Sequence, residues 1–143
     1  MKNLRNFVLL SLIFLLSHLV HSHHAFTAEF DANAPINITG KVVKVEWINP
    51  HAWVHVEVEQ GAKRTIWMVE GGTPNTLIRN GLTKNSIKPG TVINVRGYQS
   101  KGKLCLPRCI ANGRDITFPD GRKVFMGSSG TGAPRDGSDP RER

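Results

Sequence analysis

Cysteine is scarce in this sequence, which has only Cys105 and Cys109 among its 143 residues. This pair supplies too few ligands for a structural zinc site, and the lack of CxxC and CxxCH motifs argues against covalent haem. On a straight strand, residues four apart are separated by roughly 13 Å, which is beyond disulfide reach. Pro107 between them could fold the segment into a turn that closes the gap, so a disulfide and two free thiols both stay open.

Long apolar runs are also lacking, because the main one, over residues 7–16, is too short to span a bilayer. Two basic residues before this run and a short polar stretch after it are typical of a signal peptide. We therefore predict a signal peptide over residues 1–22, cleaved between Ser22 and His23, with cleavage after Ala25 as the alternative. The mature protein is then expected in the periplasm, with no membrane span.

Acidic residues are few, at 11 against 19 basic ones, which gives a formal net charge of +8. Removing residues 1–22 takes away two basic residues and no acidic one, so the net charge falls to +6. The remaining basic residues are scattered without a run, and this scatter gives little support to nucleic-acid binding. No phosphate loop, HExxH motif or serine nucleophile elbow is present, so we assign no catalytic residue.

The most informative pattern is the alternation over residues 42–59, which predicts two strands hinged on Asn49-Pro50. One face of the second strand is apolar and is expected to build a core: Ala52, Val54, Val56 and Val58. The other face carries imidazole, indole and carboxylate groups: His51, Trp53, His55, Glu57 and Glu59. A strand that only covers a core does not need so much chemistry on its outer face.

The rest of the chain predicts further strands and one short helix. A Thr73 cap followed by Pro74, with Gly81 after the last turn, is typical of a helix of about two turns. Strands are expected over residues 36–47, 51–59, 64–70, 91–98 and 104–111, with a hairpin of 115–118 and 123–125. These elements favour a mainly β fold, a small OB-like barrel of five to seven strands with one short helix between strands 3 and 4. A sheet packed on one helix is the alternative.

The domain boundaries follow from composition. We predict one barrel domain over residues 23–126, beginning with a polar leader at 23–35 that is anchored by Phe26 and Phe30. Val43, Val45 and Trp47 are expected on one face of the first strand. Residues 127–143 contain almost nothing apolar and are predicted to be a disordered tail.

A metal site is the first chemical hypothesis. If cleavage exposes His23, its free amine and its ring can chelate one ion, and His24 or His51 can add a further imidazole. Nitrogen ligands of this kind suit Cu(II), which makes copper the candidate cofactor. The competing interpretation is that the leader is merely polar and mobile.

The outer face with Trp53, His55 and Glu57 is the second hypothesis, as a binding face. His51 and His55 are roughly 13 Å apart along a strand, so one metal ion cannot take both of them directly. His51 is the better ligand because it follows Pro50 at a bend, whereas His55 is expected to pair with a carboxylate across strands. The alternative is that these side chains only cover a half-exposed barrel wall.

Five segments carry a resemblance to known proteins: HHAFTAEFDANAPI, VEWINPHAWVHVEV, VEGGTPNTLIRNG, KPGTVINVRGY and FPDGRKVFMGSSGTGAP. With these segments the chain resembles a family of small secreted bacterial proteins whose function is unknown. The resemblance extends from His23 to about Pro134 and implies a periplasmic protein of a Gram-negative bacterium, with a signal peptide and a compact β fold. It implies no activity, and the cysteine pair is not among its motifs.

Together these features favour an exported, non-catalytic binding module, with copper at His23, His24 and His51 as the candidate ligand site. The alternative function is a protein interaction module that docks a periplasmic partner through the Trp53 face or an open barrel edge. We expect neither nucleic-acid binding nor a membrane span in the mature chain.

Overall fold

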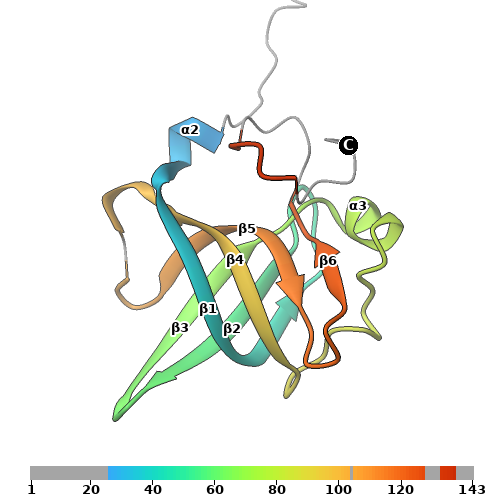
Figure 1. The fold of residues 1–143 in the computed structure, drawn as a ribbon, viewed down its shortest axis with the longest axis horizontal. Helices are drawn as coiled ribbons and strands as arrows, with labels where there is room; N and C mark the ends of the chain where they lie inside the picture. The colour runs from blue at the N-terminus through green and yellow to red at the C-terminus, as the bar shows by residue number, and fades with distance from the viewer. Residues whose placement is uncertain (1–25, 104, 128–132, 138–143) are drawn as a thin grey trace, which may run out of the picture.

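Five strands close into a β-barrel, and a sixth short strand extends it (Figure 1). The computed structural model describes residues 26–103, 105–127 and 133–137. The elements are α2 (Phe26–Glu29), β1 (Phe30–Glu46), β2 (Trp53–Gln60), β3 (Lys63–Glu70), α3 (Pro74–Arg79), β4 (Val92–Ser100), η2 (Lys101–Lys103), β5 (Cys109–Thr117) and β6 (Lys123–Phe125).

The strand order is that of an OB barrel. β1, β2 and β3 form an antiparallel meander, β1 also pairs with β4, and β4 pairs with β5. A parallel pairing of β3 with β5 closes the barrel, and α3 lies in the connection from β3 to β4. The predicted mainly β, OB-like barrel with a helix after the third strand is therefore confirmed.

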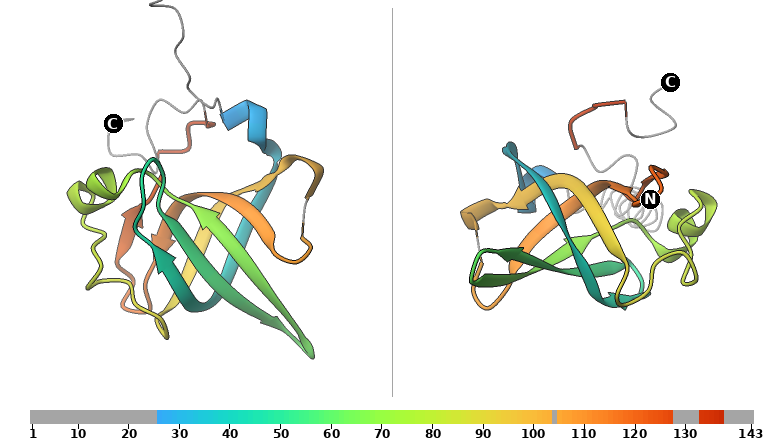
Figure 2. Two further views of the ribbon diagram at one scale, coloured as in Figure 1. Left: turned by 180° about the vertical axis from the view of Figure 1, so that it is seen from behind. Right: turned by 60° about the horizontal axis from the view of Figure 1, so that its bottom comes forward.

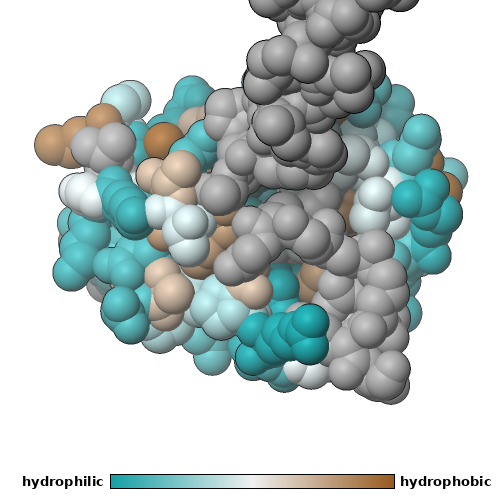
Figure 3. Space-filling view, turned by 90° about the horizontal axis from the view of Figure 1, so that it is seen from above, coloured by the Kyte–Doolittle hydropathy of each residue, from teal (hydrophilic) through white to brown (hydrophobic). Residues whose placement is uncertain are grey.

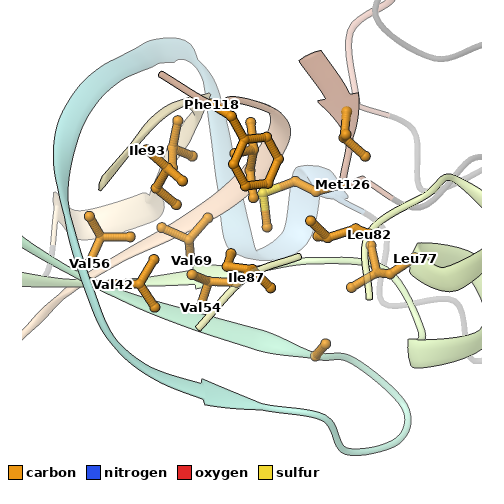
Figure 4. Close-up of a cluster of buried hydrophobic side chains, with 14 of the residues drawn as sticks. Val42, Val54, Val56, Val69, Leu77, Leu82, Ile87, Ile93, Phe118 and Met126 are labelled. Carbon is orange, nitrogen blue, oxygen red and sulfur yellow. The ribbon is translucent and has the colours of Figure 1, made fainter. Parts of the chain in front are cut away.

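The barrel interior holds the hydrophobic core that the alternation of β2 predicts. Ala52, Val54, Val56 and Val58 are all buried, with at most 6% of each exposed. Figure 4 shows β2 valines converging with side chains from β1, β3 and β4 and with Leu77 of α3. Burial of this set drives closure, because each such side chain contributes roughly 1.5–3 kcal/mol on leaving water.

A β-bulge in β1 corrects one prediction. Val42 pairs with Val56 and Lys44 pairs with His55, so Val43 is an extra residue without an opposite partner. The extra residue resets the alternation, so that Val42 is buried in the core while Val43 is 39% exposed. The prediction that Val43 shares one face with Val45 and Trp47 was wrong, because Val45 and Trp47 pack against the core whereas Val43 is exposed.

The short helix has the predicted cap. The Thr73 hydroxyl accepts a hydrogen bond from the amide of Thr76 at 3.2 Å, and Pro74 occupies the first turn. Gly81, with φ of +89°, follows the helix in a conformation that favours glycine. Leu77 is the buried residue of the helix and fixes α3 to the end of the barrel.

Two strand boundaries differ from the predicted ones. β1 begins at Phe30, so the second half of the predicted leader is strand, and Phe26 and Phe30 are both buried as expected. β5 covers residues 109–117 as one strand, and its last three residues form the predicted hairpin with β6. Backbone pairing with β3 and β4 therefore extends a strand that the sequence pattern divides in two.

Cys105 and Cys109 form a disulfide that closes the loop before β5, with their Cα atoms 3.7 Å apart. Cys105 lies outside the strand, so the separation of two residues on one straight strand does not apply to this pair. The structure thus contains the first of the two states that the sequence left open.

The structure describes only part of each end of the chain. The predicted signal peptide at residues 1–22 lies outside the described residues, and so do His23 and His24. Of the predicted tail, Gly127 and residues 133–137 are described, and Figures 1 and 2 show residues 133–137 at the same end of the barrel as α2. In the described part of the chain, no helix has the length and apolar content to cross a membrane.

Candidate functional site

The outer surface of β2 and β3, flanked by β1 and β5, gathers the polar residues that the sequence singles out. β2 and β3 lie in front when the barrel is seen from behind, and none of the described helices covers them (Figure 2). Across the strands, Trp53 faces Glu46 on one side and Glu70 on the other, and Glu70 faces Asn112. OB barrels commonly bind ligands on this face, which is an analogy of fold and not a property of these residues.

His51 contacts Glu70 at the end of this face. Its Nδ1 pairs with Oε1 of Glu70, because the backbone of Ala52 bonds to Gly71 and Gly72 and so extends the β2–β3 pairing past Trp53. The imidazole side chain is 30% exposed, whereas the carboxylate side chain is only 8% exposed. With Nδ1 engaged, Nε2 on the opposite side of the ring is the nitrogen available to a ligand.

Burial raises the pKa of Glu70, because the charged carboxylate loses solvent there. The neighbouring His51 and a hydrogen bond with Asn112 oppose this shift, and the negative charge of Glu29 adds to it. Glu29 belongs to α2, so the start of the described chain passes close enough to Glu70 to act on it electrostatically. Helix α2 and His51 therefore share one end of the barrel.

His55 lies further along β2 and has the opposite exposure. Only 3% of its side chain is exposed, and its Nε2–H donates to Oε1 of Glu46 at 2.9 Å. Lys44 contacts the same carboxylate oxygen at 2.6 Å. The predicted pairing of His55 with a carboxylate across strands is confirmed, and β1 supplies the partner.

Desolvation lowers the pKa of His55, which favours the neutral imidazole. Glu46 opposes this shift, while Lys44 and Arg108 reinforce it. The pKa of Glu46 is itself lowered, first by its hydrogen bond with Lys44. This ring is thus a neutral, buried donor within a closed set of contacts, and it is unsuited to exchange ligands with solvent.

Of the remaining predicted face residues, Trp53 and Glu57 are half-buried and Glu59 is exposed. Trp53 lies between the two histidine pairs, and Glu57 faces Lys41 across β1 and Ile66 across β3. Glu57 also lines a surface hollow of about 220 Å³ with Glu59 and Lys41. Seen from above, the described surface is mostly hydrophilic, and its apolar residues lie in small separate groups (Figure 3).

The structure brings the predicted ligands together only in part. His51 is present on the exposed face, but its two predicted partners lie outside the described residues. Within residues 26–103, 105–127 and 133–137, no three His, Cys, Asp or Glu side chains are grouped to hold a metal ion. Copper binding at His23, His24 and His51 therefore stays a prediction.

Sequence reasoning missed Glu70 as the partner of His51. The signal was present in the β2–β3 hairpin, whose tight turn pairs Gln60 with Lys63. Counting back from that turn places Glu70 opposite Trp53, two residues along the same face from His51. Glu46 could be found only with the register of β1, which the bulge at Val43 shifts.

The chain belongs to a family of unknown function, DUF6152, whose model matches residues 12–105. This match covers β1 to β4 and includes His51, Trp53, His55 and Glu70. No curated protein matches the chain.

Proposed function

We propose that this member of the family is an exported, non-catalytic binding module that holds Cu(II) at the end of the barrel where His51 and Glu70 lie. The observation that carries the proposal is the His51–Glu70 contact, in which a buried carboxylate fixes a partly exposed imidazole by its Nδ1. Metal-binding histidines are commonly held in this way, with the second ring nitrogen pointing to the ion.

The other ligands come from the mature N-terminus. Cleavage before His23 leaves an amine and a ring on one residue, and His24 is the neighbouring imidazole. Three peptide units separate His23 from Phe26, a reach of roughly 10 Å, and α2 lies at the same end as His51. An amine and two or three imidazoles supply the nitrogen plane that Cu(II) prefers.

Export is part of the proposal, because only signal peptidase creates the N-terminal amine. We place the mature protein in the periplasm on the sequence of residues 1–22, which has the pattern of a signal peptide. Binding is favoured over catalysis because His55, the second histidine of the face, is buried and fully engaged with Glu46.

The second candidate function is docking of a periplasmic protein through the Trp53 face. Trp53 is half-buried between Glu46 and Glu70, which suits an aromatic anchor on a polar surface. An open barrel edge is less suitable, because pairing of β3 with β5 closes the five-stranded barrel. A partner that co-purifies with the metal-free protein, and is lost in Trp53→Ala, would favour docking over copper.

The test starts from protein secreted with its own signal. Intact mass and N-terminal sequencing should show a chain that begins at His23. Calorimetric titration should then show one Cu(II) bound per chain, with affinity that falls at least about tenfold in His23→Ala or when one glycine precedes His23.

The pH profile gives a further check. Affinity should fall below about pH 6, because metal ligands must be deprotonated and reference imidazoles titrate near pH 6.5. A secreted chain that begins at Phe26, or copper binding that His23→Ala leaves unchanged, would remove the proposal.

A further inference from the structure

Two arginines and an acidic residue of the tail meet on the β1–β4–β5 side of the barrel, which faces the viewer in Figure 1. They line a hollow of about 260 Å³ together with Tyr98 and residues 35–37 of β1. Arg96 comes from β4 and Arg114 from β5, whereas Asp136 lies beyond the last strand. This site lies apart from the His51–Glu70 contact and does not depend on it.

The first arginine already has a strong partner. Arg96 donates from Nε to both oxygens of Asp115, at 3.1 Å each, and from Nη2 to Oδ2 at 2.5 Å. Asp115 is almost completely buried, and Lys123 approaches it at 3.5 Å. Arg96 also lies 3.5 Å from Asp136. Its guanidinium is therefore fixed by Asp115 and presents its remaining charge to the hollow.

The second arginine is the unusual one. Only 4% of the Arg114 side chain is exposed, and its Nη2 donates to Oδ1 of Asp136 at 3.0 Å. Its guanidinium also lies over the ring of Phe125, 5.3 Å from the ring centre. A buried guanidinium is costly without a carboxylate partner, so the barrel needs an anion at this position.

A charge count of this cluster supports the same need. Three cations, Arg96, Arg114 and Lys123, meet one buried carboxylate of the barrel itself, Asp115. Asp136 brings the second negative charge from a segment outside the strands. Asp136 thus places a negative charge beside both arginines that line the hollow.

We propose that this hollow is a binding site for a small carboxylate anion and that Asp136 is its tethered occupant, which the free ligand displaces. The side-chain carboxylate of Asp136 marks where the ligand's carboxylate lies, against Nη2 of Arg114 and close to Arg96. Guanidinium groups recognise carboxylates through paired, charge-assisted hydrogen bonds.

The size of the hollow indicates the class of ligand. Pockets for drug-sized molecules begin at roughly 300 Å³, so a hollow of about 260 Å³ fits a small organic acid. Tyr98 and Ile36 give it an apolar wall beside the cationic one. A tethered carboxylate competes at an effective concentration of roughly millimolar, so the intact protein should bind such acids weakly.

The experiment is an NMR titration of the full mature chain with succinate, in EDTA and at constant ionic strength. Asp136→Asn should bind succinate at least about tenfold more tightly than the wild type, with the largest shifts at Gly97 and Tyr98. Asp120→Asn is the matched control, because Asp120 is an exposed acid on the β5–β6 turn that contacts Arg122. It should behave like the wild type.

A second substitution tests whether the gain in succinate affinity depends on the arginines of the hollow. Arg114→Lys in the Asp136→Asn background keeps the positive charge but removes the planar fork, so the tenfold gain should disappear. Because Arg114 is buried, Arg96→Gln in the same background serves as the second variant and should also reduce the gain. The proposal is overturned if Asp136→Asn gains no affinity, if Asp120→Asn gains as much, or if the shifts lie away from the hollow.

Discussion

Two histidine–carboxylate pairs lie on the same face of the barrel, four residues apart on the chain, and their exposures are reversed. In the first pair the His51 ring is 30% exposed and the Glu70 carboxylate is 8% exposed. In the second pair the His55 ring is 3% exposed and the Glu46 carboxylate is 26% exposed. The same two residue types thus give a partly exposed imidazole at the end of the face and a buried imidazole at its centre.

The physical cause of the difference is the position along β2. His55 lies within β2, between β1 and β3, where only 3% of its side chain is exposed and desolvation lowers its pKa. His51 precedes the strand, and the buried member of its pair is the carboxylate at the end of β3, whose pKa burial raises. In each pair, burial favours the neutral form of the covered group.

The largest expected difference between the two histidine–carboxylate pairs is in the free energy of unfolding. His55→Ala should lower the free energy of unfolding by about 2–4 kcal/mol, because it empties a buried site and removes the donor to Glu46. His51→Ala should cost less than half as much, because its ring is partly exposed. Urea unfolding at pH 7 measures the loss of stability in both variants. An equal loss in the two variants, or a larger loss in His51→Ala, would contradict the comparison.

The next effect concerns the two carboxylates. Glu70→Gln should weaken Cu(II) binding about 10- to 100-fold, because the carboxylate orients the His51 ring. Glu46→Gln is the matched control and should leave copper affinity unchanged, since its histidine is not a ligand. Calorimetric titration of both mature variants checks this, and an equal loss would contradict the assignment.

A smaller effect is the pH dependence of stability that His55 contributes. Because the pKa of His55 is lowered in the folded state, the imidazole is protonated at a higher pH in the unfolded chain than in the folded one. The folded state therefore loses stability as pH falls below about 6.5. His55→Gln keeps a donor for Glu46 but does not titrate.

Between pH 7 and 5, the wild type should therefore lose more of its free energy of unfolding than this variant does. Unfolding curves at several pH values measure the difference. The charged groups that act on His55 are Glu46, Lys44 and Arg108, and a difference that is independent of pH would mean that the ring is already solvated.

The smallest effect is expected at the far end of the face. Glu59 and Arg64 pair at 3.1 Å with both side chains exposed, so Glu59→Gln should change stability by less than about 0.5 kcal/mol. Thermal unfolding at low and high salt tests this. A larger change would mean that the exposure of the side chains on this face does not determine how much each contributes to stability.

Much of the fold was predictable because local patterns agree with it. The alternation of β2, the Thr73 cap and the turn at Gly61 each specify their own element without help from distant residues. The bulge at Val43 was not predictable, because an apolar residue such as Val43 is compatible with the alternating pattern of β1 on either face of the strand.

The candidate site was less predictable, because its contacts join separate strands. The outer face of β2 and the cross-strand pairing of His55 follow from period and polarity, but the partners depend on register. For Glu70, the only signal in the sequence was its position at the end of a strand. For Asp136, the sequence showed only a tail whose composition suggests disorder. Its contact with Arg114 depends on the buried position of that arginine, which composition does not reveal.

The most direct test of the account compares Cu(II) binding by mature His51→Gln and His55→Gln, each beginning at His23. Glutamine in either place leaves an amide to contact the carboxylate, so both variants should stay folded. We expect at least a tenfold loss of affinity for His51→Gln and none for His55→Gln. Equal affinities in the two variants would contradict it.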